Sequence, residues 1–80
     1  MKVLIIEDEK PNADRLKRLI HAQFPQAEII AVLECISESI TWFKENPHPD
    51  VVMMDVRLSD GLSFEIFEKV SIQCPVIFTT

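Results

Sequence analysis

Residues 50–55 read DVVMMD, a run of four apolar residues enclosed by two aspartates. Residues 2–9 read KVLIIEDE and repeat this arrangement, because an apolar run again ends abruptly in acid. Continuous apolar runs of this length are typical of strands that are buried on both faces of a parallel sheet. The two stretches therefore predict interior strands at residues 3–6 and 51–54, each followed directly by carboxylates.

Helical and extended patterns alternate on either side of these strands. Pro11 suits the first turn of a helix, and apolar residues then recur at helical spacing as far as Pro25. A second helix is predicted from an N-cap at Ser37 to residue 46, and a third over residues 62–70. Further strands are predicted at 29–33 and 75–80, with a turn at 59–61.

This βαβαβαβ order predicts a parallel sheet with helices on both faces, since parallel strands are joined by crossover helices. The corresponding fold class is α/β, and if the sheet is flavodoxin-like and doubly wound its strand order is 2-1-3-4. In that order the first and third strands are neighbours, and ligands bind beyond their carboxyl ends where the strand order reverses. We therefore expect Glu7, Asp8 and Asp55 to converge at this edge of the sheet.

Composition narrows the class of protein. Eighty residues make at most one domain, and the net charge of -5 argues against nucleic-acid binding by this segment, which needs clustered lysines and arginines. No apolar run approaches the roughly 18 residues of a membrane span, and no signal-peptide pattern is present, so a cytoplasmic location is expected. Cys35 and Cys74 are too few for a disulfide framework or a zinc site, which predicts reduced thiols.

The carboxylates at the two strand ends predict a binding site for a divalent cation. Three carboxylates in close proximity repel one another unless a hard cation such as Mg²⁺ neutralises them. Mg²⁺ is held by one or two carboxylates together with waters and phosphate oxygens, which leaves a carboxylate oxygen able to attack a phosphoryl group. A second interpretation stays open, because Asp8 and Glu9 also precede a helix whose N-terminus favours negative side chains.

At these two motifs the chain resembles the receiver domains of two-component response regulators. Residues 2–9 resemble the family's opening acidic motif, and residues 50–55 resemble its phosphoacceptor strand. The resemblance implies that Asp55 accepts a phosphoryl group from a sensor histidine kinase, with Mg²⁺ as the cofactor.

The same resemblance implies a role for each site residue. Asp8 and Asp55 would bind Mg²⁺ directly, Glu7 would act largely through a metal-bound water, and the backbone carbonyl of Arg57 would complete the protein's share of the coordination. Thr80, at the end of the fourth strand, would be the switch residue, with Thr79 one position away.

The chain departs from the family pattern in two places. Residues 58–61 read LSDG, which is shorter than usual and lacks a proline. This compact form is similar to receivers that precede LytTR-type DNA-binding domains, so a transcription-regulating output domain is implied. Family members also have five strands and five helices in roughly 120 residues, about the size of one domain. We therefore expect residues 1–80 to be the N-terminal part of a single receiver domain, with the fifth strand, the last two helices and an active-site lysine absent.

The sequence was also compared with two other functions. A haloacid-dehalogenase-like phosphatase needs an Asp-x-Asp motif, which neither acidic strand end supplies. A receiver-like interaction fragment without phosphotransfer is the main alternative, and no enzymatic activity beyond self-catalysed phosphorylation of Asp55 is expected.

Two surfaces are candidates for partners. The first helix carries four basic residues, Lys10, Arg15, Lys17 and Arg18. They could contact the kinase or form a solvated helix face. The apolar fourth strand is expected to be an unprotected sheet edge, which predicts self-association or domain swapping. No membrane contact is expected.

Overall fold

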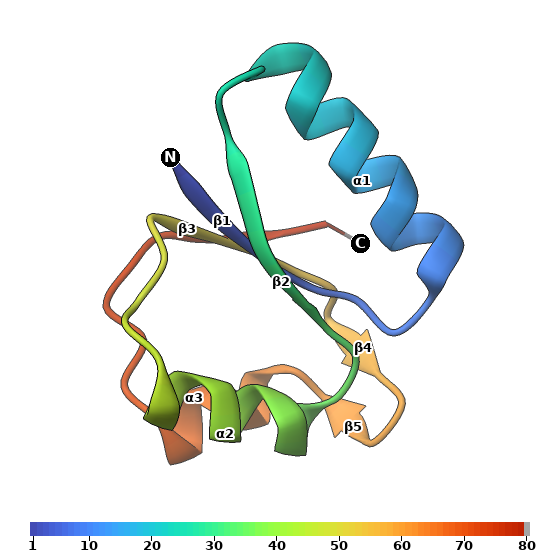
Figure 1. Cartoon of the computed structure of the whole chain (residues 1–80). Coiled ribbons are helices and arrows are strands. Elements are labelled where there is room, and N and C mark those ends of the chain that lie inside the picture. Colours follow the sequence, from blue (N-terminus) through green and yellow to red (C-terminus); the bar gives the residue numbers. More distant parts are fainter. Residues whose placement is uncertain (80) are drawn as a thin grey trace.

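A parallel sheet with helices on both faces forms the core of the computed structural model, which describes residues 1–79 (Figure 1). The strands of this sheet lie in the order β2-β1-β3-β6. Their bounds are Lys2–Ile6 for β1, Glu28–Leu33 for β2, Val51–Met54 for β3 and Val76–Phe78 for β6. The helices are α1 (Lys10–Gln23), α2 (Ile36–Glu45) and α3 (Phe64–Lys69). Since β6 is the fourth strand of this sheet, the predicted order 2-1-3-4 is confirmed.

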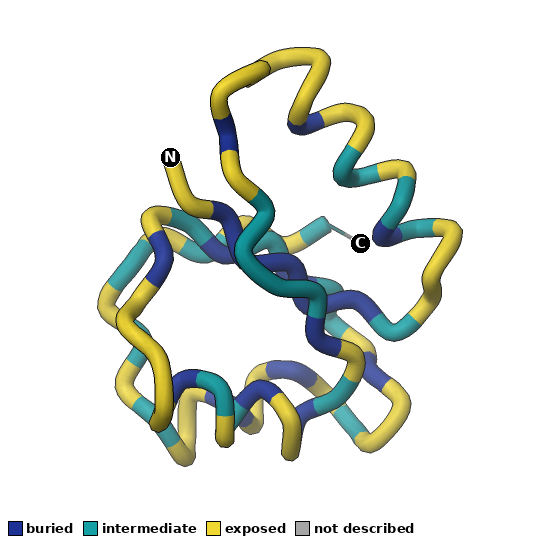
Figure 2. Tube along the Cα trace, viewed as in Figure 1, coloured by how far each residue is buried: buried dark blue, intermediate teal, exposed yellow. Residues whose placement is uncertain are grey.

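Alternate residues of β1 enter two separate cores. Val3 and Ile5 pack with residues of α1, whereas Leu4 and Ile6 pack with residues of α2 and α3 on the opposite face. These side chains are almost fully buried, and Figure 2 shows the buried stretch of β1 at the centre of the molecule. The continuous apolar run therefore reflects a strand covered on both faces, as the sequence predicted.

The predicted apolar face of the first helix needs correction. Leu19 and Phe24 belong to the apolar residues that recur at helical spacing before Pro25, which predicted that they pack inward, but their exposed fractions are 55% and 57%. Ala13 and Ile20 supply the buried face of α1 instead. Helix α1 lies over this face of the sheet (Figure 1). No described helix is long and apolar enough to cross a membrane.

The segment after Asp55 forms a small hairpin that the sequence did not predict. Strands β4 (Arg57–Leu58) and β5 (Gly61–Leu62) pair antiparallel around a turn at Ser59 and Asp60. Leu62 therefore belongs to a strand, and the third helix is shorter at both ends than the predicted range 62–70. Gly61 adopts φ 142°, a value that L side chains rarely adopt, so the turn depends on a glycine.

The hairpin turn supplies the N-terminal cap of α2. The Asp60 carboxylate accepts hydrogen bonds from the backbone N–H groups of Ile36, at 2.8 Å, and Ser37, at 3.2 Å. The predicted cap at Ser37 is wrong, because Cys35 occupies the cap position and makes no side-chain cap hydrogen bond. A contact between segments far apart in the sequence thus replaces the expected local cap.

We predict that Asp60→Ala lowers the melting temperature at neutral pH by about 4 °C, because α2 loses the acceptor for its first N–H groups. Those N–H groups hold the pKa of Asp60 below its ordinary value, chiefly through Ile36. Because the pKa of Asp60 is lower in the folded chain than in the unfolded chain, its carboxylate stabilises the fold at pH values above the unfolded-state pKa. This stabilisation is lost as the pH falls through the folded-state pKa. Circular dichroism melts should therefore separate parent and variant at pH 7, and the difference should shrink as the pH falls below the ordinary range of aspartate pKa values. Ser59→Ala is the matched control, and equal melting temperatures at pH 7 would contradict the capping role.

Candidate metal site at the carboxyl edge of the sheet

Backbone pairing places the acidic residues at one edge of the sheet. Ile6 lies opposite Met54 in the pairing of β1 with β3. The ladder continues one residue further, because the Asp55 N–H donates to the Ile6 carbonyl at 2.9 Å and the Glu7 N–H donates to the Leu33 carbonyl at 2.8 Å. Glu7 and Asp55 are therefore the first residues beyond two neighbouring strands, with their backbones still held by the sheet.

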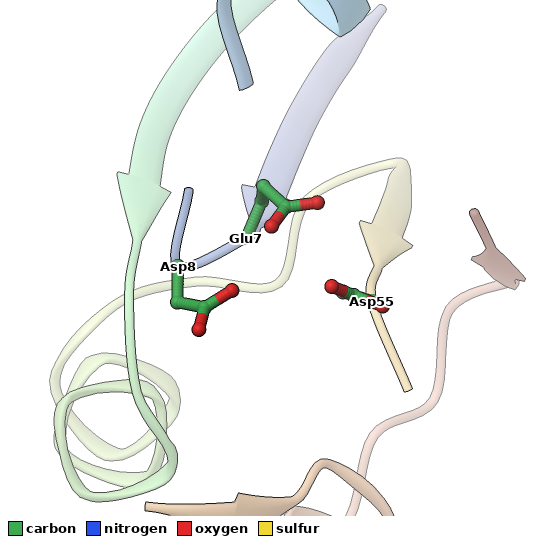
Figure 3. Close-up of side chains that lie close together, drawn as sticks. All are labelled: Glu7, Asp8 and Asp55. Carbon is green, nitrogen blue, oxygen red and sulfur yellow. The ribbon is translucent and has the colours of Figure 1, made fainter. Parts of the chain in front are cut away.

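The side chains of Glu7, Asp8 and Asp55 converge, as predicted (Figure 3). One carboxylate oxygen from each lies within 4.8 Å of the others. Within residues 1–79 no other group of three or more histidine, cysteine, aspartate or glutamate side chains is close enough to hold a metal ion. Carboxylate oxygens are the ligands that Mg²⁺ and Ca²⁺ prefer, so the donor set fits a hard divalent cation.

Glu7 is the least accessible of the three, with an exposed fraction of 4%. Its Oε2 atom accepts a hydrogen bond from the Glu9 backbone N–H at 3.1 Å. Burial raises the pKa of Glu7, the hydrogen bond from Glu9 opposes this, and the neighbouring Asp55 and Asp8 raise it further. The negative charge of this cluster is therefore costly in the folded chain, and a bound cation would relieve the repulsion.

An open cleft of about 380 Å³ lies beside Asp55. Helix α1 lines one side of it with Asn12 and Arg15, and Thr79 lies at the end of β6. The sequence prediction grouped Arg15 with the basic residues of the first helix and did not identify Asn12 as a site residue. The spacing of three residues from Glu9, the N-cap residue, to Asn12 and on to Arg15 is the signal that makes each side chain a neighbour of the next.

The structure also places Arg57 and the histidines and cysteines of the chain. Arg57 begins β4 and its side chain is exposed, while the proposed role of its backbone carbonyl stays a prediction. Thr80 lies outside the described residues. His21 and His48 are exposed, and the thiols of Cys35 and Cys74 are free.

Comparison with curated proteins identifies relatives of one kind. The chain is 32% identical to sensory transduction protein LytT of Bacillus anthracis over 83 aligned residues, which cover 100% of this chain and 33% of that protein. It is 30% identical to the Enterococcus faecalis protein of the same name over 71 residues, covering 89% of this chain and 28% of that protein. The chain thus spans about a third of the length of these relatives. No family model matches the chain.

Solved structures of response regulators share the fold. The response regulator PhyR from Brucella abortus superposes with a TM-score of 0.78 at 25% sequence identity, over 96% of this chain and 32% of that chain. The REC domain of the response regulator PhyR from Erythrobacter litoralis gives a TM-score of 0.71 at 27% identity, over 96% of this chain and 60% of that chain. Sequence and structure comparisons therefore agree on the same class of signalling domain.

We predict that Asp8→Asn and Asp55→Asn each weaken Mg²⁺ binding at least about tenfold, because second-shell changes alone cost that much. Isothermal titration calorimetry with Mg²⁺ measures the effect. Asp14→Asn is the matched control, since Asp14 is an acidic residue of α1 that pairs with Lys10 and Lys17 outside the cluster. Without metal, the two cluster variants should melt no lower than the parent because carboxylate repulsion is reduced. Equal Mg²⁺ affinity in all four chains would contradict a metal site here.

Proposed function

Because the chain is a response-regulator receiver domain, we propose that Asp55 accepts a phosphoryl group from a sensor histidine kinase. The observation that carries this proposal is the position of Asp55, which directly follows a central strand and lies with Glu7 and Asp8 at the switch point of the sheet. The adjoining open cleft gives a phosphoryl donor access to the Asp55 side chain.

The proposed reaction is a transfer between two side chains. An Asp55 carboxylate oxygen attacks the phosphorus atom of a phosphohistidine, so that an O–P bond forms while the N–P bond breaks. The electron pair of the broken bond returns to the imidazole nitrogen of the kinase. The backbone hydrogen bond from the Asp55 N–H to the Ile6 carbonyl, at 2.9 Å, holds the nucleophile at the edge of the sheet during this step.

The carboxylates of Asp8 and Asp55 are the proposed direct ligands of Mg²⁺, with Glu7 acting through a water and the Arg57 carbonyl completing the protein's share. When bound, Mg²⁺ supplies positive charge to the phosphoryl oxygens and reduces repulsion among the carboxylates. The burial and raised pKa of Glu7 support this assignment, because a buried carboxylate beside two others is best neutralised by a cation. Thr80 is the proposed switch residue.

We further propose that residues 1–80 are the N-terminal part of a receiver domain within a longer cytoplasmic regulator. The LytT relatives are about three times as long as this chain, which supports an output region in the full protein. A LytTR-type DNA-binding domain is the proposed output, and the activity of the receiver itself would be confined to self-catalysed phosphorylation.

The alternative function is an interaction module that binds partners without phosphotransfer. The outer strand β6 favours such contacts, because it pairs with β3 on one side and exposes 50% of Ile77 and 41% of Phe78. Mg²⁺ binding at millimolar concentrations would argue against this alternative, since a module without phosphotransfer has little need of a metal.

We predict that incubation with acetyl phosphate and Mg²⁺ adds one phosphoryl group to the parent chain and none to Asp55→Asn. Intact-mass spectrometry measures the gain. Asp50→Asn is the control at the opposite end of the same strand, and it should be phosphorylated like the parent. A parent chain that binds Mg²⁺ but gains no mass would contradict autonomous phosphorylation.

We also predict that the chain self-associates through β6 as its concentration rises. Unpaired backbone groups and exposed apolar side chains on an outer strand favour pairing with a second copy. Sedimentation velocity should show a concentration-dependent shift that Ile77→Lys reduces, because charge on an edge strand opposes such pairing. Leu19→Lys is the control, since Leu19 is equally exposed but lies on α1. A monomer at all concentrations would exclude this contact.

A further inference from the structure

We infer that Arg15 of α1 is an anion-binding residue that contacts the phosphoryl group on Asp55. The inference rests on the proposed function and adds one positively charged side chain to the proposed site. Arg15 and Asp55 line the same open cleft, of about 380 Å³, together with Glu7, Glu9, Asn12, Leu16 and Thr79. Among the described residues that line this cleft, Arg15 is the one that carries a positive charge.

Hydrogen bonds connect Arg15 to two other polar side chains that line the cleft. Glu9 is the N-cap residue of α1, and Asn12 and Arg15 follow at steps of three residues, so each side chain is a neighbour of the next. The Asn12 side-chain amide donates to Glu9 Oε1 at 3.1 Å, and Arg15 Nη2 donates to Asn12 Oδ1 at 3.5 Å. The other basic residues near this end of α1 have a different arrangement, because Lys10 and Lys17 both pair with Asp14.

Phosphorylation of Asp55 would change the negative charge in the cleft that Arg15 lines. A phosphoryl group on Asp55 brings further negative charge and acceptor oxygens into a site that already holds three carboxylates. A guanidinium group binds such oxygens with two parallel N–H donors, a geometry that a single ammonium group does not match. Before phosphorylation the same positive charge slightly disfavours a divalent cation nearby. Arg15 therefore affects the two ligands of the site in opposite directions.

The test uses beryllium fluoride, a phosphoryl analogue, titrated calorimetrically into the chain at saturating Mg²⁺. Arg15→Gln should weaken beryllium fluoride binding about fivefold, the upper range for an exposed ion pair. Its affinity for Mg²⁺ alone should be unchanged or up to about twofold tighter. Arg15→Lys should restore part of the loss, and the exposed Arg18→Gln on the same helix should behave like the parent.

Each outcome decides between the two proposals. If the parent binds beryllium fluoride and Arg15→Gln binds it equally well, the inference about Arg15 fails while the proposed function stands. If Arg15→Gln loses affinity for Mg²⁺ and beryllium fluoride in parallel, the residue has a structural role and the inference also fails. If the parent gains no phosphoryl group and does not bind the analogue, both the proposed function and the role of Arg15 are overturned.

Discussion

Ile6 and Met54 lie opposite each other where β1 pairs with β3, and this register determines both the core and the site. Side chains alternate between the two faces of a strand, so a slip of one residue would exchange the residues that enter each core. The same slip would separate the backbone of Asp55 from Ile6, to whose carbonyl it donates a hydrogen bond. Burial of the apolar residues therefore holds the carboxylates in place.

The acidic cluster is maintained against electrostatic repulsion. Glu7 is buried beside Asp8 and Asp55, and its pKa is raised chiefly by that burial. The neighbouring strands are anchored by almost fully buried residues such as Leu4 and Val52, so the sheet can support an unfavourable arrangement at its edge. Stored repulsion of this kind is typical of functional sites, because a ligand of opposite charge then binds with a larger gain.

The loop that follows Asp55 is held at several points. The β4–β5 hairpin closes it locally, the Ser63 N–H donates to the Val56 carbonyl at 2.8 Å, and Asp60 caps α2. A change in the conformation of this loop would therefore alter the acceptor for the first N–H groups of α2. The connection gives the acidic edge a direct mechanical link to the helix layer on one face of the sheet.

Local patterns in the sequence were sufficient to predict the alternation of strands and helices. The strand order known for flavodoxin-like sheets then predicted the convergence of Glu7, Asp8 and Asp55. These features depend on apolar runs, helical periodicity and the parallel connection rules, all of which act over short stretches of chain. The sequence also carried the resemblance to receiver domains, which the LytT and PhyR comparisons support.

Only the tertiary structure decided which residues far apart in the chain meet. Asp60 caps a helix that begins 24 residues earlier, Leu19 and Phe24 are left exposed, and Arg15 faces the cleft of Asp55. No local pattern contains this information, because it depends on how α1 and the hairpin pack against the finished sheet. The local sequence around a residue is the same whether or not a distant partner contacts it. The partner can be identified only in the folded chain.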